Sequence, residues 1–548
     1  MIEEYFVSEH LMSYWKRGQM NTQQFLSDQD YMRRAIALAR KGEGWCHPNP
    51  MVGAVIVKDG RVIGEGYHAR CGELHAERNA FASLTEPAAG ATIYVTLEPC
   101  CHYGRTPPCT EAIIEHQISR VVIGSRDPNP KVSGGGARVL REAGITVEED
   151  FLREECDALN PVFFHYITSK TPYVIMKYAM TADGKIATKT GVSKWITGEK
   201  ARTRVHELRH ACMGIMAGIG TVLADDPMLN CRIPNGRDPV RIICDSRLQI
   251  PLESNLCRTA GEIPLIVACA FPGLPVGPVE TAKNLMQKGR SDSPWNVPEQ
   301  THGSDSPRNT PEQTHGSGNP RNAPLQTPGS DNPRNAPLQT PGSDSPRNAP
   351  GEMSGQAALE NQPGEQVIEK IQKLQELGVQ ILNVPAKSGH SEQVDDFSQS
   401  HQNQQIQSEQ QNLGNQMIHS DQQILENQQN RQERQDPQNQ KNARVDLRLL
   451  AQLLGQMEID SILLEGGGTL NESALRAGIV HEVRAFIAPK IFGGSAKSPV
   501  EGTGVAFPDE SVRLSMKNVE QIGKDLLVTW LCNAGWDCGS TKSGAISK

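Results

Sequence analysis

The chain has 548 residues, a formal net charge of −8 and 37% hydrophobic residues, so it is long enough for two or three domains. No basic run is long enough to indicate a nucleic-acid-binding stripe, and no apolar run approaches the length of a membrane span. The first 28 residues lack the continuous apolar region of a signal peptide. The thirteen cysteines are scattered, which favours reduced thiols over a disulfide framework. We therefore expect a soluble, cytoplasmic protein.

Helix-like and strand-like patterns alternate from residue 28 to about residue 150. The helical pattern "YMRRAIALARKG" follows Ser27 and Asp28, which are possible helix caps. Two β-rich runs surround Asp59-Gly60, a dipeptide that favours a hairpin turn. The helical segments "ELHAERNAFASL", "CTEAIIEHQI" and "GGARVLREAG" then alternate with the strand-like "ATIYVTLEPC", "RVVIGSRDP" and "ITVEE". This alternation predicts a layered α/β domain.

A second α/β domain is predicted after one connecting helix, "REECDALNPVFFHYITSK", and it opens with the strand "YVIMKYAMT". Two low-complexity stretches interrupt it. Residues 288–365 hold a 13-residue repeat with at most one Leu per copy, and residues 389–443 are rich in Gln and Asn. Neither stretch offers an apolar face for a core, so both are predicted to be disordered. The segment "EQVIEKIQKLQELGVQILNVP" between them predicts a short helix and a strand.

The segments "HAERNA" and "PCCHYGRTPPC" carry residues that suit a zinc site. A deaminating zinc centre needs three protein ligands and an open fourth position for the attacking water. His75, Cys100 and Cys109 can supply these ligands, and Glu77, as a non-ligand, can carry protons between the water and the leaving ammonia. Spacing alone leaves Cys101 or His102 as alternative ligands. Any one of these residues taken alone is more simply a core residue.

Phosphate binding is indicated in the second domain by "LLEGGGTLNESALRAG", a β-rich run followed by three glycines and a helix. Such a junction presents bare backbone N–H groups and a helix dipole to a phosphate, although a tight structural turn explains the glycines equally well. No GxGxxG motif follows a strand, so a Rossmann fingerprint is absent. Arg209 and Arg232 can bind phosphate oxygens through their guanidinium forks, but a lone arginine is more often a solvated charge.

The two sets of motifs together resemble the bifunctional riboflavin-biosynthesis enzymes. "PCCHYGRTPPC" matches their pyrimidine deaminase half, in which eight residues separate the two cysteines instead of the two of the general deaminase signature. "PYVIMKYAMTADGKIATKTGVSKWITG" and "AGIGTVLADDPMLNCR" match their reductase half. The resemblance covers about residues 28–272 and 445–531. It implies an N-terminal cytidine-deaminase-like α/β/α layered domain and a C-terminal dihydrofolate-reductase-like α/β domain with a long disordered insertion.

Composition and the resemblance together predict a division of the chain, in which the leader, the two insertions and the tail lie outside the resemblance. The segments are a flexible leader (1–27), a zinc-dependent pyrimidine deaminase domain (28–150), a connecting helix (151–171), the first part of the reductase domain (172–287), the repeat insertion (288–365), a reductase helix and strand (366–388), the Gln/Asn-rich insertion (389–443), the second part of the reductase domain (444–532) and a tail (533–548). The reductase sheet is expected to be complete, because the entropic cost of loop closure grows by only about 0.6 kcal/mol for each doubling of loop length.

The resemblance further assigns site residues and two cofactors. It implies Zn²⁺ held by His75, Cys100 and Cys109, with Glu77 as the catalytic residue, and NADPH in the reductase. The implied cofactor contacts are Ala179, Trp195, Thr221, Asp225, Ser246 and Gly467. The implied substrate contacts are Asn49, His68, Ser193, Arg209, Leu229, Arg232 and Glu465. Taken alone, Asn49 is most simply a turn residue and His68 a surface loop residue. Asp225 is also a candidate for handling protons, although "ADDP" reads equally well as a capped turn.

The function implied is two consecutive steps of riboflavin synthesis. The first is hydrolytic deamination of 2,5-diamino-6-hydroxy-4-(5-phosphoribosylamino)pyrimidine. The second is NADPH-dependent reduction of the ribosyl chain, which gives 5-amino-6-(5-phosphoribitylamino)uracil. The alternatives are a single-activity nucleobase or nucleoside deaminase with a degenerate reductase domain, and a non-catalytic interaction protein. The expected partner is the phosphorylated pyrimidine, with no nucleic acid and no membrane, and a homo-oligomer is expected because the family commonly forms one.

Overall fold

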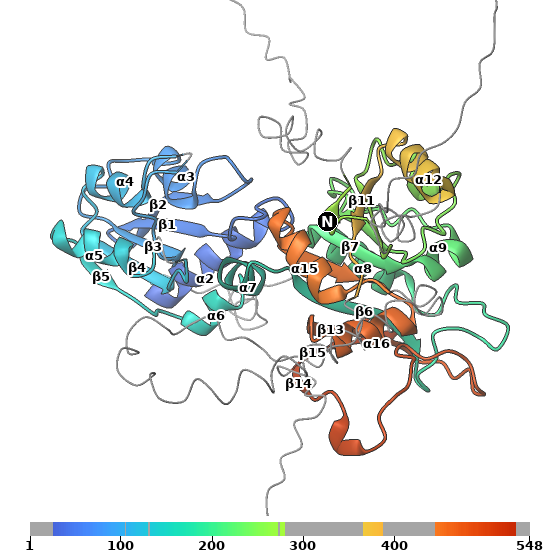
Figure 1. The fold of residues 1–548 in the computed structure, drawn as a ribbon. Coiled ribbons are helices and arrows are strands. Elements are labelled where there is room, and N and C mark those ends of the chain that lie inside the picture. Colours follow the sequence, from blue (N-terminus) through green and yellow to red (C-terminus); the bar gives the residue numbers. More distant parts are fainter. Residues whose placement is uncertain are drawn as a thin grey trace, which may run out of the picture. The chain divides into compact units, whose positions relative to one another are not determined.

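The computed structural model describes residues 26–104, 106–129, 132–271, 274–279, 365–386 and 444–532. The predictions of disorder for the repeat and for the Gln/Asn-rich tract, and those for the leader and the tail, fall almost entirely outside these residues. Within them, no helix is both long and apolar enough to cross a membrane. The described residues form two separate β-sheets flanked by helices (Figure 1).

The first sheet has five strands in the order β2-β1-β3-β4-β5. β1 and β2 form the predicted antiparallel hairpin around Asp59-Gly60, β1 also pairs antiparallel with β3, and β3, β4 and β5 run parallel. The sequence of β1, "GAVIVK", is β-branched and almost wholly buried, as expected for a strand that is covered on both faces. The strands are β1 (Gly53–Lys58), β2 (Arg61–Tyr67), β3 (Thr92–Leu97), β4 (Arg120–Ser125) and β5 (Thr146–Glu148).

Alternate residues of β1 point to two different hydrophobic cores. Ile56 packs in the core that contains residues of α3, α4 and α5, whereas Val55 packs in the core that contains residues of α2 and α6. The predicted cap at Ser27 is confirmed, since its side chain accepts from the backbone of Asp30 in a capping box. The helices are α2 (Asp28–Ala39), the 3₁₀ helix η1 (Arg40–Gly42), α3 (Ala76–Ala82), α4 (Cys109–Glu115), α5 (Gly135–Glu142) and α6 (Arg153–Asp157). The predicted α/β/α layering is therefore confirmed.

The single connecting helix predicted over residues 151–171 is wrong. The chain forms two helices there, α6 and α7 (Pro161–Ser169), and Asn160 precedes the second with a non-helical backbone. Pro161 is the first residue of α7, where its lack of a backbone N–H costs nothing, but a proline inside a continuous helix would remove a hydrogen bond. The proline therefore starts a new helix.

The second sheet has ten strands in the order β10-β11-β9-β8-β7-β12-β6-β13-β15-β14. The seven strands from β11 to β13 pair parallel, while β10 at one edge and β15 and β14 at the other are antiparallel to their neighbours. The strands are β6 (Tyr173–Thr181), β7 (Gly214–Gly218), β8 (Val240–Cys244), β9 (Leu265–Cys269), β10 (Gly277–Pro278), β11 (Gln380–Asn383), β12 (Ser461–Leu464), β13 (Val480–Ala488), β14 (Leu514–Ile522) and β15 (Asp525–Cys532).

The helix and strand predicted between the two low-complexity stretches are present. α12 (Glu365–Glu376) is followed by β11, which joins this second sheet beside β9. Ile371 and Leu374 of α12 are buried in the same core as Ile381 of β11. The other helices around this sheet are α8 (Glu199–Ala211), α9 (Ile219–Asp225), α10 (Asn255–Arg258), α15 (Leu447–Gln456), α16 (Gly468–Arg476) and the 3₁₀ helix η2 (Pro508–Glu510).

An arginine with no exposed surface lies inside the second domain. Arg241 of β8 donates from Nη2 to the carbonyl oxygens of Leu256, at 3.2 Å, Thr259, at 3.1 Å, and Ile263. Its Nη1 also donates to the Thr259 hydroxyl, at 2.7 Å. The partners are neutral backbone and hydroxyl groups that close the turn after α10. The guanidinium therefore satisfies carbonyl groups that would otherwise be buried without a donor.

Replacing Arg241 with Met is expected to destabilise the second domain by about 3 kcal/mol, because several buried carbonyls lose their donors at once. Differential scanning calorimetry of the purified chain measures this as a lower unfolding midpoint. Arg258→Met, at an exposed position of α10, is the matched control and is expected to change stability by less than about 0.5 kcal/mol. Equal midpoints for the two variants would contradict the role of the buried guanidinium.

Candidate active sites

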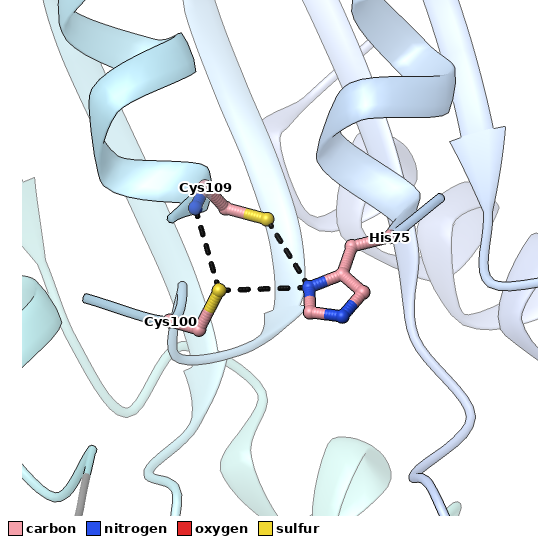
Figure 2. Close-up of side chains that lie close together, drawn as sticks. All are labelled: His75, Cys100 and Cys109. Carbon is pink, nitrogen blue, oxygen red and sulfur yellow. Dashed lines mark hydrogen bonds between the residues drawn. The ribbon is translucent and has the colours of Figure 1, made fainter. Parts of the chain in front are cut away.

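Three predicted zinc ligands converge at one end of the first sheet. His75 is the N-cap of α3, Cys109 is the first residue of α4, and Cys100 follows β3. His75 Nδ1 lies 3.5 Å from the Cys100 Sγ and 3.4 Å from the Cys109 Sγ (Figure 2). Usual Zn–N and Zn–S bonds at tetrahedral angles put nitrogen and sulfur about 3.6 Å apart. The three side chains therefore fit a single zinc ion.

The environment of Cys100 favours its thiolate form. The backbone N–H of Cys109 donates to its sulfur at 3.3 Å. Hydrogen bonding from the Cys109 side chain is the main cause that lowers the pKa of Cys100 to about 4, and His75 adds to it. Since the thiolate is the form that binds zinc, Cys100 is in the required charge state, whereas the hydrogen bond to Cys100 and burial raise the pKa of the Cys109 thiol.

Glu77 lies in the first turn of α3, two residues after His75, and is 3% exposed. Burial raises the pKa of its carboxyl group, and the nearby Cys100 sulfur adds to the effect. It lies outside the three-residue group that could share an ion. A buried carboxyl with a raised pKa beside an open metal position can both accept and return a proton.

The alternative ligands, Cys101 and His102, are not brought to this position. Within the described ranges, the group of side chains that could hold a metal ion contains His75, Cys100 and Cys109 and neither of these two. The sulfur of Cys101 instead lies close to Gly135 at the start of α5, where an added Cβ would meet it at 2.8 Å.

Asn49 and His68 line the same cavity as the zinc ligands His75 and Cys100, a space of about 440 Å³. His68 is 3% exposed, so its simplest interpretation as a surface residue is wrong. Its Nδ1 lies 3.1 Å from the Leu74 carbonyl oxygen and its Nε2 lies 3.2 Å from the Asn49 amide nitrogen. Burial lowers the pKa of His68, so its imidazole is neutral at pH 7, with Nδ1–H donating to Leu74 and Nε2 accepting from Asn49.

Asp127, which was not predicted as a site residue, follows β4 and lines the same cavity. Burial raises the pKa of its carboxyl group to about 6. The motif "DPNP" directly after a strand is the only signal that marks it in the sequence, and such a motif is an ordinary turn in most proteins.

Metal analysis of the purified chain is expected to find about one zinc per chain, as one closed set of three ligands requires. Cys109→Ser is expected to lose most of it, since a serine hydroxyl is a poor zinc ligand. Cys101→Ser, one residue from a ligand and similar in chemistry, is the matched control and is expected to retain it. Loss of zinc from Cys101→Ser together with retention in Cys109→Ser would contradict the ligand assignment.

A second cluster of charged side chains forms where β12 ends. Glu465 receives hydrogen bonds from Arg209 of α8, from Nε at 2.7 Å and from Nη2 at 3.1 Å, and from Lys177 of β6 at 3.3 Å. All three side chains are about 12% exposed. Burial alone would raise the pKa of the Glu465 carboxyl group, but Arg209 and Lys177 hold it well below its usual value. Lys177 was not predicted, although it lies two residues before Ala179 on the same strand.

Of the other predicted substrate residues, Leu229 is buried and Arg232 and Ser193 are exposed. Leu229 has a positive φ of 50°, and the carbonyl oxygen of the next residue, Asn230, accepts from Arg209 at 2.9 Å. The structure therefore links this segment to Arg209 and Glu465. It does not bring the side chains of Arg232 or Ser193 to them.

A cavity of about 640 Å³ lies beside the carboxyl ends of β7, β8 and β12, the edge at which open α/β sheets bind ligands. The helices α9 and α16 start at this cavity, and their N-caps, Gly218 and Gly467, leave the first backbone N–H groups without a side-chain cap. Such donors suit a phosphate. The cavity is lined by five of the predicted residues, namely Ser193, Thr221, Asp225, Ser246 and Gly467.

Ala179 and Trp195 do not line this cavity. Trp195 is 65% exposed and stacks under the guanidinium of Arg202, 4.7 Å from its ring centre. Asp225 ends α9 and lies 3.8 Å from Lys194. The neighbouring Asp226 accepts from the backbone N–H of Asn255, as a turn residue does.

Comparison with known proteins gives matches to both domains. A model of the cytidine and deoxycytidylate deaminase zinc-binding region matches residues 26–125, and a model of the RibD C-terminal domain matches residues 172–272 and 395–528. The riboflavin biosynthesis protein RibD of Actinobacillus pleuropneumoniae is 40% identical over 512 residues, 93% of this chain and 97% of that protein. RibD of Aquifex aeolicus is 48% identical over 263 residues, 48% of this chain and 72% of that protein.

Solved structures give the same result. Acinetobacter baumannii RibD matches with a TM-score of 0.59 and 27% identity over 92% of this chain and 99% of that chain. The diaminohydroxyphosphoribosylaminopyrimidine deaminase/5-amino-6-(5-phosphoribosylamino)uracil reductase of Thermotoga maritima matches with a TM-score of 0.56 and 29% identity, over 92% and 98%.

The two folds and their sites define a zinc-dependent deaminase joined in one chain to a reductase with a dihydrofolate-reductase-like fold. The deaminase is a hydrolase with zinc as its cofactor, and the reductase is an oxidoreductase that uses NADPH. Both catalyse steps of riboflavin biosynthesis. The chain belongs to the RibD family of bifunctional riboflavin-biosynthesis enzymes.

Proposed function

We propose that the chain deaminates the phosphoribosylaminopyrimidine and then reduces its ribosyl chain with the residues placed above. The observation that carries the proposal is the group of His75, Cys100 and Cys109, two of which, His75 and Cys100, line one cavity with Glu77. The charged groups of both sites are present, which argues against the two alternative functions, a deaminase with a degenerate reductase domain and a non-catalytic interaction protein. A degenerate reductase would have no reason to keep the buried cluster around Glu465, and a non-catalytic interaction protein would need neither site.

In the deaminase, His75, Cys100 and Cys109 would hold the ion, and the bound ion would supply a water that ionises near neutral pH. Glu77 would carry one proton from the attacking water to a ring nitrogen, and then a second, from the hydroxyl added to the ring carbon, to the amino group, which leaves as ammonia. His68 fixes the side chain of Asn49 through their hydrogen bond, and the remaining N–H and the carbonyl oxygen of the Asn49 amide, which lines the cavity, can orient the pyrimidine. We also assign Asp127 to substrate binding, because its carboxyl group lines the same cavity.

In the reductase, Glu465 and Arg209 would bind the substrate, and Lys177 beside them is a further candidate for that role. NADPH, when bound, supplies the hydride, so the protein has mainly to align the nicotinamide with the ribose carbon. Ser193, Leu229 and Arg232 remain proposed substrate contacts, and the proposed cofactor contacts are Ala179, Trp195, Thr221, Asp225, Ser246 and Gly467. Domain boundaries near residues 150 and 172 are part of the same proposal.

Glu77→Gln is expected to lower the rate of deamination by about 10²- to 10⁴-fold, because an amide cannot carry the proton. Zinc content should stay at one per chain, and reduction of a pre-deaminated substrate should be preserved. Ammonia release and NADPH oxidation, measured separately, check these outcomes. Loss of both activities would indicate a folding defect, and unchanged ammonia release would contradict the role of Glu77.

Glu465→Gln is expected to impair the reductase and to leave the deaminase unchanged. Removing the charge leaves Arg209 and Lys177 without their shared buried partner, so NADPH oxidation should fall at least about tenfold while ammonia release is unchanged. Glu369→Gln is the control, because that glutamate makes an exposed pair with Lys373 on α12 and surface pairs contribute little. A Glu465→Gln variant with normal NADPH oxidation would contradict the assignment.

We also infer that the chain forms a homo-oligomer through the face of β14 and β15. Leu514, Met516, Val519 and Leu526 are 40–67% exposed. Their positions in the antiparallel register place them on one face of the sheet with Trp530, opposite to the face on which Leu527 packs into the core. These five side chains carry no charge, and β14 is the edge strand. Such a face is typical of an interface between copies.

Sedimentation velocity is expected to show an oligomer for the wild-type chain and a monomer for the double variant Met516→Glu, Leu526→Glu, because two charges would be buried in each copy of the interface. Lys524→Glu, in the exposed turn between the two strands, is the control and should keep the oligomer. A wild-type monomer at micromolar concentration would contradict the proposal.

A further inference from the structure

The orientation of the cofactor in its cavity follows from the order of the strands. Hydride transfer requires the nicotinamide to lie beside the substrate, and the cluster of Lys177, Arg209 and Glu465 places the substrate at the ends of β6 and β12. Along the sheet the order is β8-β7-β12-β6, so β8 lies at the far side of the cavity from β6. The N-terminus of α16, which follows β12, lies between, where it suits the diphosphate. The adenosine end of the cofactor is therefore expected at the carboxyl end of β8.

Arg444 lies at this adenosine end. The next residue, Val445, donates its backbone N–H to the hydroxyl of Ser246, at 3.2 Å, in the loop that follows β8. The backbone on both sides is held by the segment after β11, since Ala386 donates to the Arg444 carbonyl at 2.8 Å and Asp446 donates to Val384 at 2.9 Å. The Arg444 side chain is exposed and lines the cavity. A backbone held by hydrogen bonds thus presents an exposed cation to the adenosine end.

Position in the cavity distinguishes Arg444 from the other cation in the lining, Lys497. Within the part of the chain that the structure describes, no acidic side chain forms an ion pair with Arg444. Lys497 lies on the nicotinamide side, because its carbonyl oxygen accepts from Ile186 in the loop that follows β6. Of the two acidic residues in the lining, Asp225 lies near Lys194 and Glu501 accepts from the backbone of Ser498. Of the two cations in the described lining, Arg444 is therefore the one beside Ser246.

We propose that Arg444 binds the 2′-phosphate of NADPH and makes the reductase prefer NADPH to NADH. This inference rests on the proposed function. NADPH and NADH differ only in this phosphate, which replaces a hydroxyl on the adenosine ribose. A guanidinium offers two parallel N–H donors to phosphate oxygens, and the bond is charge-assisted. The Ser246 hydroxyl accepts from Val445, so its own hydrogen is free to donate to the same phosphate.

The test compares two probes, adenosine 2′,5′-bisphosphate and 5′-AMP, which differ in the 2′-phosphate alone. Isothermal titration calorimetry measures their binding to the full-length wild-type chain and to Arg444→Gln. The variant is expected to weaken the bisphosphate about tenfold or more, the usual effect of losing a hydrogen bond between two charged groups, and to leave 5′-AMP unchanged. Equal effects on both probes, or none on either, would overturn the proposal.

Lys497→Gln is the matched control, because it removes a cation from the other end of the same cavity. It is expected to change the affinities of the two probes by the same factor. A selective loss of the bisphosphate in this variant, with Arg444→Gln normal, would move the phosphate site to Lys497 and overturn the proposal. Arg444→Lys keeps the charge without the fork and should bind the bisphosphate with intermediate affinity.

Steady-state kinetics with pre-deaminated substrate separates this inference from the proposed function. If the wild-type chain does not oxidise NADPH, the reductase assignment itself fails. If it does, Arg444→Gln should raise the KM for NADPH about tenfold or more, leave the KM for NADH unchanged and keep kcat for both. If the KM values of Arg444→Gln for NADPH and NADH had the same ratio as in the wild-type chain, the role of Arg444 would be overturned, but the reductase assignment would stand.

Discussion

The deaminase site depends on the close approach of three ligand atoms, which lie within 4.8 Å of one another. Two of them come from helix starts and one from the loop after β3, so the pairing of β1, β2 and β3 decides whether they meet. Gly66 of β2 packs against α3 so closely that an added Cβ would lie 2.3 Å from the backbone nitrogen of Ala80. This close contact holds the helix that begins at His75 against the sheet. The ion-binding geometry is therefore a property of the packing as well as of the motif.

The second site is built on a different principle, in which one carboxylate is shared by two cations. Glu465 is separated from Arg209 by 256 residues and from Lys177 by 288. The charges meet because β12 is inserted between β7 and β6 in the sheet, although it follows both in the chain. Taking three charged side chains out of water is costly unless they pair, so this order of strands is needed for the cluster to be stable.

These two principles explain how much of the molecule could be predicted. The zinc ligands and Glu77 could be predicted because their motifs are local and their spacing is characteristic, and the hairpin at Asp59-Gly60 because its turn chemistry is specific. Lys177 could not, since a lysine in a strand gains a partner only through the order of the strands. Asp127 was missed because its only local signal is a common turn. The break before Pro161 shows that a proline outweighs a helical pattern on both sides.

The position of β11 has a consequence for the integrity of the chain. α12 and β11 lie between two long stretches of sequence, 280–364 and 387–443, and β11 pairs with β9 and β10 inside the second sheet. If a protease cut once in each stretch, the piece containing α12 and β11 would no longer be covalently attached. It would still be held by the strand ladder and by the buried Ile371, Leu374 and Ile381. A reductase made of three polypeptides could thus persist as one folded unit. A denaturing gel would then show three fragments, although the fragments are still assembled in the native protein.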